Sequence, residues 1–160
     1  MFSCAWQSSS TAQGIEIPPA PAAEAFTDAR LQRAADTLQR GRHSLAMRLL
    51  ESRIDQIRRR IRNGFHGKST ARRRRALDAL VGSGLPLVIV AGDRFWLRAD
   101  ILRLAACLHA SMQRWDQSAS YLLDLVRSGQ ASADDLAFAR RVARLVPLHP
   151  LGMKLADSPR

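Results

Sequence analysis

The segment Gly64–Thr70 contains the residues that come nearest to a catalytic motif. Gly67, Lys68 and Ser69 match the end of a phosphate-binding loop, in which backbone amides and a lysine hold nucleotide phosphates. Arg62 occupies the position of that motif's first glycine, and an arginine-rich helix is expected where the motif requires a β-strand. An enzyme of phosphate chemistry is therefore our third hypothesis, behind two kinds of binding protein.

The histidines and cysteines form no other catalytic or metal-binding pattern. None of the histidines has a second ligand at a metal-binding spacing; they are His43, His66, His109 and His149. Cys4 and Cys107 are the only cysteines, so a disulfide framework is not indicated, and Cys107 is expected to be a small buried hydrophobic residue. We expect no catalytic residue, metal or cofactor.

Positive charge is concentrated between residues 58 and 75, in a chain whose formal net charge is +11. Nine positive side chains lie within eighteen residues: Arg58, Arg59, Arg60, Arg62, Lys68, Arg72, Arg73, Arg74 and Arg75. Such density favours an anionic partner, and we predict that these residues bind it. A solvated helix face and the arginine bias of a GC-rich genome are the alternatives. Phe65 is the only aromatic residue nearby, which disfavours recognition of single-stranded bases by stacking.

Residues 1–25 are rich in proline, serine and alanine and are predicted to form a flexible tail. As an alternative, its apolar residues could dock as an extended peptide; these are Phe2, Trp6, Ile15 and Ile17. The N-terminus has no basic segment followed by an apolar run, and no stretch approaches about 18 apolar residues. We therefore expect a cytoplasmic protein without a membrane span.

Helical spacing of apolar residues predicts an all-α domain over residues 26–147, followed by a loose C-terminal tail at 148–160. The expected helices lie at about 29–40, 44–62, 71–81, 93–112, 116–126 and 133–146. Ser132 and Asp135 have the spacing of a capping box at the start of the last helix, and Pro147 ends it.

The apolar run at residues 85–91 suits a buried strand or a buried helical turn equally well. No second strand candidate is recognised elsewhere, and an isolated strand has no pairing partner. We therefore predict a buried helix that begins at Pro86.

Two segments share one arrangement, in which a tight turn is followed by a small residue and then by a large apolar residue one turn later. In the first, Gly41 closes the turn, Ala46 permits close approach of two helices and Leu50 fills the hairpin core. The corresponding residues of the second are Trp115, which packs over the turn, Ser118 and Leu122. Both segments resemble tetratricopeptide repeats.

Ala46 and Ser118 are 72 positions apart, close to twice the roughly 34-residue period of such repeats. The resemblance covers about a third of the chain. It departs from the family pattern because Arg53 stands where a small residue is usual, the closing prolines are missing and the middle unit has no recognisable pattern. A divergent bundle of helix hairpins is the alternative fold.

The resemblance implies stacked antiparallel helix hairpins, in about two or three degenerate repeats, whose groove holds a peptide or helix of a protein partner. Small bacterial chaperones of type III secretion systems are similar in size and repeat type. Our leading hypothesis is thus a non-catalytic scaffold or chaperone of unknown oligomeric state. The alternative is a nucleic-acid-binding accessory protein that uses residues 58–75, and steep weakening by salt would distinguish it.

Overall fold

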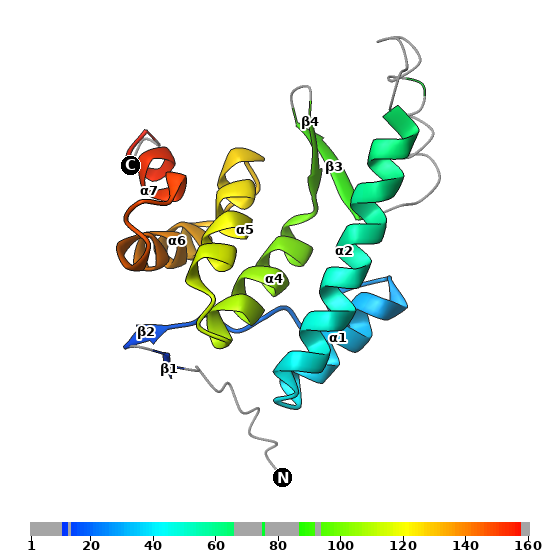
Figure 1. Ribbon diagram of the computed structural model, residues 1–160, viewed down its shortest axis with the longest axis horizontal. Helices are drawn as coiled ribbons and strands as arrows, with labels where there is room; N and C mark the ends of the chain where they lie inside the picture. The colour runs from blue at the N-terminus through cyan, green and yellow to red at the C-terminus, as the bar shows by residue number, and fades with distance from the viewer. Residues whose placement is uncertain (1–10, 13, 66–74, 76–86, 92–93, 158–160) are drawn as a thin grey trace. The chain divides into compact units, whose positions relative to one another are not determined.

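The computed structural model describes residues 11–12, 14–65, 75, 87–91 and 94–157. The fold is mainly all-α, as predicted, with a minor strand content. The chain divides into two compact units (Figure 1). Unit 1 comprises residues up to Pro21 together with Arg103–Arg160, and unit 2 comprises Ala22–Leu102. Among the described residues, none of the helices is both long enough and apolar enough to span a membrane.

Unit 2 is built on an antiparallel pair of helices, α1 (Ala29–Gln39) and α2 (His43–Phe65) (Figure 1). A short 3₁₀ helix, Ala23–Ala25, precedes them and lies against α1. Gly41 adopts a φ of 72° in the turn between the helices, a conformation that costs glycine little because it has no Cβ. The apolar faces of the pair are buried at positions spaced by three and four, which confirms the helical pattern expected here.

Residues 88–97 correct our prediction for the apolar run at 85–91. Val88–Ala91 form strand β3 and Arg94–Leu97 form strand β4, paired antiparallel from Val88 opposite Leu97 to Ala91 opposite Arg94. A helix from Pro86 is therefore wrong, and the helix expected from Asp93 instead begins at Ala99. The missed signal was the pair Gly92-Asp93 between two apolar stretches, which is typical of a two-residue hairpin loop. The helix predicted at 71–81 lies outside the described residues, apart from the helical Arg75.

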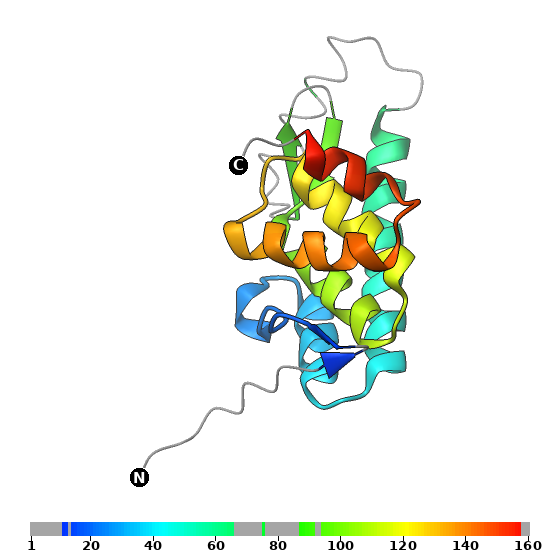
Figure 2. The same cartoon turned by 90° about the vertical axis from the view of Figure 1, so that its left-hand side faces the viewer.

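Unit 1 contains most of α4 (Ala99–Ser111), with α5 (Trp115–Arg127), α6 (Ala133–Leu145) and α7 (Pro150–Ala156). Helices α5, α6 and α7 contact one another in pairs, and Figure 2 shows them side by side. The capping box predicted at the start of α6 is confirmed, because the Ser132 hydroxyl and the Asp135 carboxylate each accept a hydrogen bond from the other residue's backbone N–H.

The expectation of a loose tail at 148–160 is wrong for the residues of α7. The Nδ1 atom of His149 accepts a hydrogen bond from the backbone N–H of Leu151, and Pro150 occupies the first helical position, where a proline costs no hydrogen bond. Leu151 is fully buried, so this helix also contributes to the core of unit 1.

The flexible tail predicted for residues 1–25 is also incorrect for the part that the structure describes. Strands β1 (Thr11–Ala12) and β2 (Ile15–Glu16) form an antiparallel hairpin around Gly14, whose φ is 75°. The side chain of Ile17 retains only 3% of its exposure. At Ile15–Ile17 the chain docks as an extended segment, which was our alternative prediction for this region.

Candidate functional site

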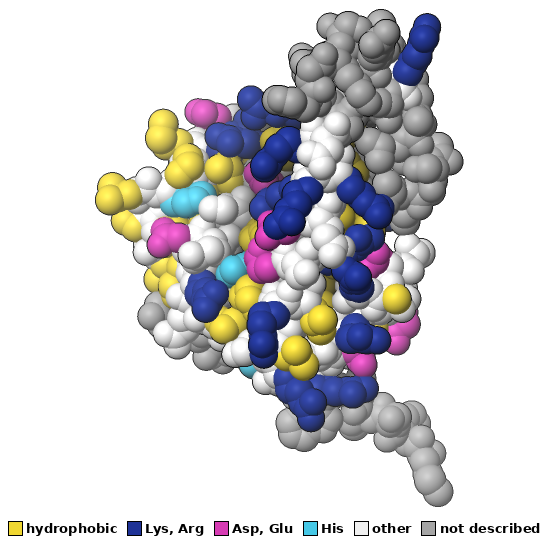
Figure 3. Space-filling view, turned by 45° about the vertical axis from the view of Figure 1, so that its right-hand side comes forward, with side chains coloured by type: hydrophobic (Ala, Val, Ile, Leu, Met, Phe, Trp, Pro, Cys, Tyr) yellow, Lys and Arg dark blue, Asp and Glu magenta, His cyan; other side chains and the backbone are white. Residues whose placement is uncertain are grey.

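The positively charged residues predicted to bind an anion are exposed wherever the structure describes them. Arg58, Arg59, Arg60 and Arg62 lie in the C-terminal half of α2, and Arg75 is exposed as well. In the space-filling view, Lys and Arg side chains stand out from the visible surface with fewer acidic side chains between them (Figure 3). Lys68, Arg72, Arg73 and Arg74 lie outside the described residues, so the structure does not test whether the nine charges gather.

In the first helix hairpin, the residues quoted for the repeat resemblance occupy packing positions. Ala46 and Leu50 have no exposed surface, and both lie on the inner face of α2. Arg53, a departure from the family pattern, donates hydrogen bonds of 2.9 and 2.6 Å to one carboxylate oxygen of Asp28. The other oxygen of Asp28 accepts from the backbone N–H groups of Arg30 and Leu31 and so caps α1.

The ionic state of Asp28 follows from these contacts. Burial alone would raise the pKa of the Asp28 carboxyl, but the hydrogen bonds from Arg53 and from the backbone, together with the arginine's charge, lower it below its ordinary value of 3.8. Asp28 is therefore ionised at neutral pH, and Arg53 links the start of α1 to the middle of α2.

The second hairpin, formed by α4 and α5, is joined at the position that the resemblance assigns to a small residue. The buried Ser118 hydroxyl donates a 2.9 Å hydrogen bond to the backbone carbonyl of Ala106. His109 of α4 also stacks on Tyr121 of α5, with the two ring centroids 5.4 Å apart. Both Trp115 and Leu122 are buried. The Ser118 hydroxyl oxygen is buried and lies 2.9 Å from a backbone oxygen of α4, which leaves little room for a larger side chain at this position.

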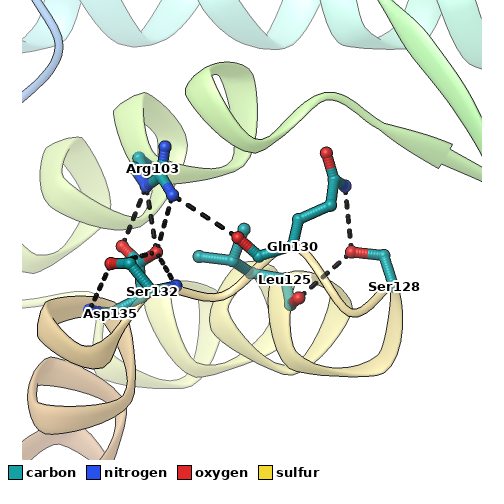
Figure 4. A network of polar contacts seen from close by, with 6 residues as sticks. All are labelled: Arg103, Leu125, Ser128, Gln130, Ser132 and Asp135. Carbon is teal, nitrogen blue, oxygen red and sulfur yellow. Dashed lines mark hydrogen bonds and ion pairs between the residues drawn. The ribbon is translucent and has the colours of Figure 1, made fainter.

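A partly buried ion pair connects α4 with the start of α6 (Figure 4). The guanidinium of Arg103 donates to both carboxylate oxygens of Asp135 at 2.8 to 3.0 Å. It also reaches the backbone carbonyl of Gln130 at 3.5 Å. The same carboxylate accepts a 2.7 Å bond from the backbone N–H of Ser132, so a single side chain both caps α6 and ties it to α4.

Asp135 remains charged despite its burial. Burial raises the pKa of its carboxyl, while the bonds from Arg103 and from Ser132 lower it by more, leaving it below the ordinary value of 3.8. The side chain of Arg103 keeps 30% of its exposure and that of Asp135 keeps 11%, so this pair is only partly removed from solvent.

The extended segment Ile15–Pro19 lies on α4 and α6 within unit 1. Strand β2 contacts α6, and the thiol of Cys107 in α4 donates a 3.5 Å hydrogen bond to the backbone carbonyl of Pro18. Burial and the negative charge of Asp135 raise the pKa of the Cys107 thiol to about 12, against an opposing effect of Arg103. The thiol is therefore protonated and a poor nucleophile where it lies.

Beside this segment is a cavity of about 200 Å³. Its apolar lining comes from Pro18 and Pro19 and from residues of α4, α5 and α6, namely Ala106, Cys107, Leu122 and Phe138. Polar residues complete the lining, namely Arg103, Ser132, Asp134 and Asp135. A mainly apolar lining with a few polar groups is typical of a site that binds a ligand or a peptide side chain.

The part of the chain that the structure describes contains no cluster of three or more His, Cys, Asp or Glu side chains able to hold a metal ion. Comparison with protein-family models, with curated proteins and with solved structures finds no match to this chain. The resemblance to tetratricopeptide repeats thus stays a prediction.

The sequence did not bring the residues that line this cavity together, although Cys107, Leu122, Ser132 and Asp135 were each named for another reason. Arg103 and Asp135 are separated by 31 residues, and nothing in their local sequence pairs them. A signal was available for Ile17, because Ile15, Glu16 and Ile17 alternate in polarity as a half-buried extended segment does. Our prediction of a flexible tail was based instead on the proline, serine and alanine content of residues 1–25.

Proposed function

We propose that this chain is a non-catalytic protein-interaction module, a scaffold or chaperone, whose unit 1 binds a segment of a partner protein on α4, α5 and α6. The observation that carries the proposal is that this surface already holds an extended segment. Ile17 is buried there, and Cys107 bonds the Pro18 carbonyl. A surface that accepts one extended segment through side-chain burial and a backbone contact has the features needed to accept another.

Two further features support binding rather than catalysis. The cavity lining is mainly apolar, which favours burial of a partner side chain. The charged lining residues Arg103 and Asp135 bond each other, and Asp135 also caps α6, while Cys107 is held as a protonated thiol. Such groups are suited to positioning a ligand rather than to transferring protons.

Site-specific photocrosslinking tests the proposal. A photoreactive amino acid at Asp134, an exposed residue that lines the cavity, should crosslink a partner protein in the native host. The same amino acid at Gln117, which is exposed on α5 and is not part of the cavity lining, is the matched control. We expect a discrete adduct at 134 and none at 117, and we expect it to persist at high salt. Equal crosslinking at both positions, or an adduct lost at high salt, would contradict binding of a partner segment at this cavity.

Exposed arginines on α2 favour a second candidate function, binding of nucleic acid through phosphates. Four of these arginines lie within five residues in the C-terminal half of the helix, and every one of them is exposed. A structural alternative is that cations near a helix C-terminus complement its dipole without any ligand.

Substitution of Arg59, Arg60 and Arg62 by alanine distinguishes phosphate binding from stabilisation of the helix dipole without a ligand. If the three contact phosphates, the slope of log K against log salt for a DNA duplex should become shallower by about 3. The exposed arginines of α6, Arg140 and Arg144, provide the control double substitution, which should leave a slope set by α2 unchanged. Equal effects of both variants would indicate binding by net charge alone.

A further inference from the structure

The N-terminal segment Gly14–Pro19 can be considered as a ligand of unit 1 rather than as part of its framework. It is extended, and it leaves unit 1 at Pro21, after which the chain continues into unit 2. The side chain of Ile17 is buried, β2 contacts α6, and the Pro18 carbonyl accepts a hydrogen bond from the thiol of Cys107.

The fit of this segment is incomplete. Ile17 is its buried residue, Ile15 and Pro18 are half-buried, and Gly14, Glu16 and Pro19 are exposed. The cavity of about 200 Å³ lies directly beside the two prolines. An occupant of the same extended form with a larger apolar side chain in this place would bury more surface than the chain's own segment does.

We propose that Gly14–Pro19 is an intramolecular occupant of the binding surface on α4, α5 and α6, and that a segment of a partner protein displaces it. The partner segment is extended, carries aliphatic residues at alternate positions and follows them with a side chain that fills the cavity. This inference rests on the proposed function for the identity of the site. The segment competes through its tethering, because attachment to the same chain gives it an effective concentration of the order of millimolar. The partner competes through the larger area that it buries.

Cys107 reports whether the segment is in place. Its side chain is 4% exposed and its Sγ contacts Pro18, so a thiol reagent reaches it only after the segment leaves. The measurement uses the full chain with Cys4→Ser, which leaves Cys107 as the single thiol, and follows N-ethylmaleimide labelling under native conditions. Loss of the buried isoleucine in Ile17→Asp should raise the labelling rate roughly ten- to hundredfold.

A matched control separates release of the segment from general loosening of unit 1. Leu151 in α7 is as deeply buried as Ile17, belongs to the same unit and is not part of the segment. Leu151→Ala should raise labelling much less than Ile17→Asp when both chains keep their helical circular dichroism. If Ile17→Asp does not fold, Ile17→Ala serves in its place. A rise in Leu151→Ala equal to that of the Ile17 variant would overturn the proposal.

Addition of the segment as a separate peptide provides the decisive test. A peptide of residues 13–21, added at millimolar concentration to the Ile17→Asp chain, should restore slow labelling of Cys107. The same peptide with Ile17→Asp should not restore it, and one with Pro19→Leu should act at a lower concentration because it fills the cavity. Absence of protection by the native peptide, or equal protection by its Ile17→Asp form, would overturn the proposal.

The labelling rate of Cys107 also shows whether the segment on this surface belongs to the same chain or to a second copy of it. An intramolecular occupant gives a rate independent of protein concentration, whereas a rate that falls as concentration rises would place a second copy's segment there and refute our assignment.

Crosslinking at Asp134 answers a different question, since it detects a partner whether or not Gly14–Pro19 is removable. If no partner crosslinks at Asp134 while Cys107 is still labelled slowly, the proposed function is rejected. The contact between Gly14–Pro19 and unit 1 is then still supported.

Discussion

The ion pair between Arg103 and Asp135 makes a quantitative prediction about the stability of unit 1. Substitution Asp135→Ala removes three hydrogen bonds from Arg103 and the carboxylate that closes the capping box with Ser132. It leaves the guanidinium without its carboxylate partner and also leaves the backbone N–H of Ser132 unpaired at the start of α6.

The magnitude follows from burial. Removal of one partner from a fully buried ion pair costs about 3–5 kcal/mol, and loss of a helix cap costs about 0.5–2 kcal/mol. Arg103 keeps 30% of its side-chain exposure and Ser132 is exposed, so water can partly replace the lost bonds. We therefore expect Asp135→Ala to lower the free energy of unfolding of unit 1 by about 2–3 kcal/mol, below the sum of those two costs.

Urea unfolding monitored by Trp115 fluorescence measures this effect within unit 1. Trp6 and Trp96 are replaced by phenylalanine so that Trp115, buried at the start of α5, is the only reporter. With a slope of about 2 kcal/mol/M, the midpoint should fall by about 1 M or slightly more. A double-mutant cycle with Arg103→Met should give a coupling energy of about 1–2 kcal/mol between the two side chains.

The neighbouring carboxylate Asp134 supplies the control. It is exposed and takes no part in the capping box, so Asp134→Ala should change the unfolding free energy by less than about 0.5 kcal/mol. A cost for Asp135→Ala no larger than that of Asp134→Ala, or a coupling energy near zero, would refute the view that this pair fastens α6 to α4.

Three further predictions concern other parts of the fold. The pKa of the Asp28 carboxyl is lowered below 3.8 in the folded chain, so its contribution to stability is present above about pH 4 and is lost as the pH falls through the folded pKa. Asp28→Asn should flatten this dependence of stability on acid pH when unfolding of unit 2 is monitored by Trp96 fluorescence. Ser118→Leu should destabilise unit 1 by about 1–3 kcal/mol through overpacking, whereas Ser118→Ala should cost about 1 kcal/mol or less, both measured by urea unfolding. Gly41→Ala, at a φ of 72°, should cost about 1–2 kcal/mol, while Gly152→Ala in α7, where nothing lies within 4 Å of an added Cβ, should stabilise by about 0.5–1 kcal/mol; equal effects in thermal unfolding would contradict the backbone argument.

Local patterns were sufficient to predict the helices whose signals are contained in a short window. Apolar residues spaced by three and four predicted a buried face on each of α1 and α2, and Leu31 in α1 and Leu50 and Ile54 in α2 are fully buried. The spacing of Ser132 and Asp135 predicted the cap of α6, because a capping box is formed within a single turn. Both kinds of signal depend only on residues close to each other in the chain.

The errors occurred where the outcome depends on a distant or unrecognised partner. The run Val88–Ala91 is apolar enough for helix or strand, and it forms a strand because it pairs with Arg94–Leu97, a partner that our prediction did not recognise. Pro150–Ala156 looked like a tail because a helix of that length is stable only when a side chain such as Leu151 is buried against other elements.

The candidate site shows the same division between local and tertiary information. The sequence by itself determined a mainly helical chain, the cap of α6, the small side chain at Ser118 and a strong excess of arginine. Only the tertiary structure decided that Arg103 meets Asp135, that Cys107 lies under Pro18 and that Ile17 is buried. These contacts join residues between 32 and 89 positions apart, and they form because folding buries apolar surface and satisfies charge across elements that local sequence cannot pair.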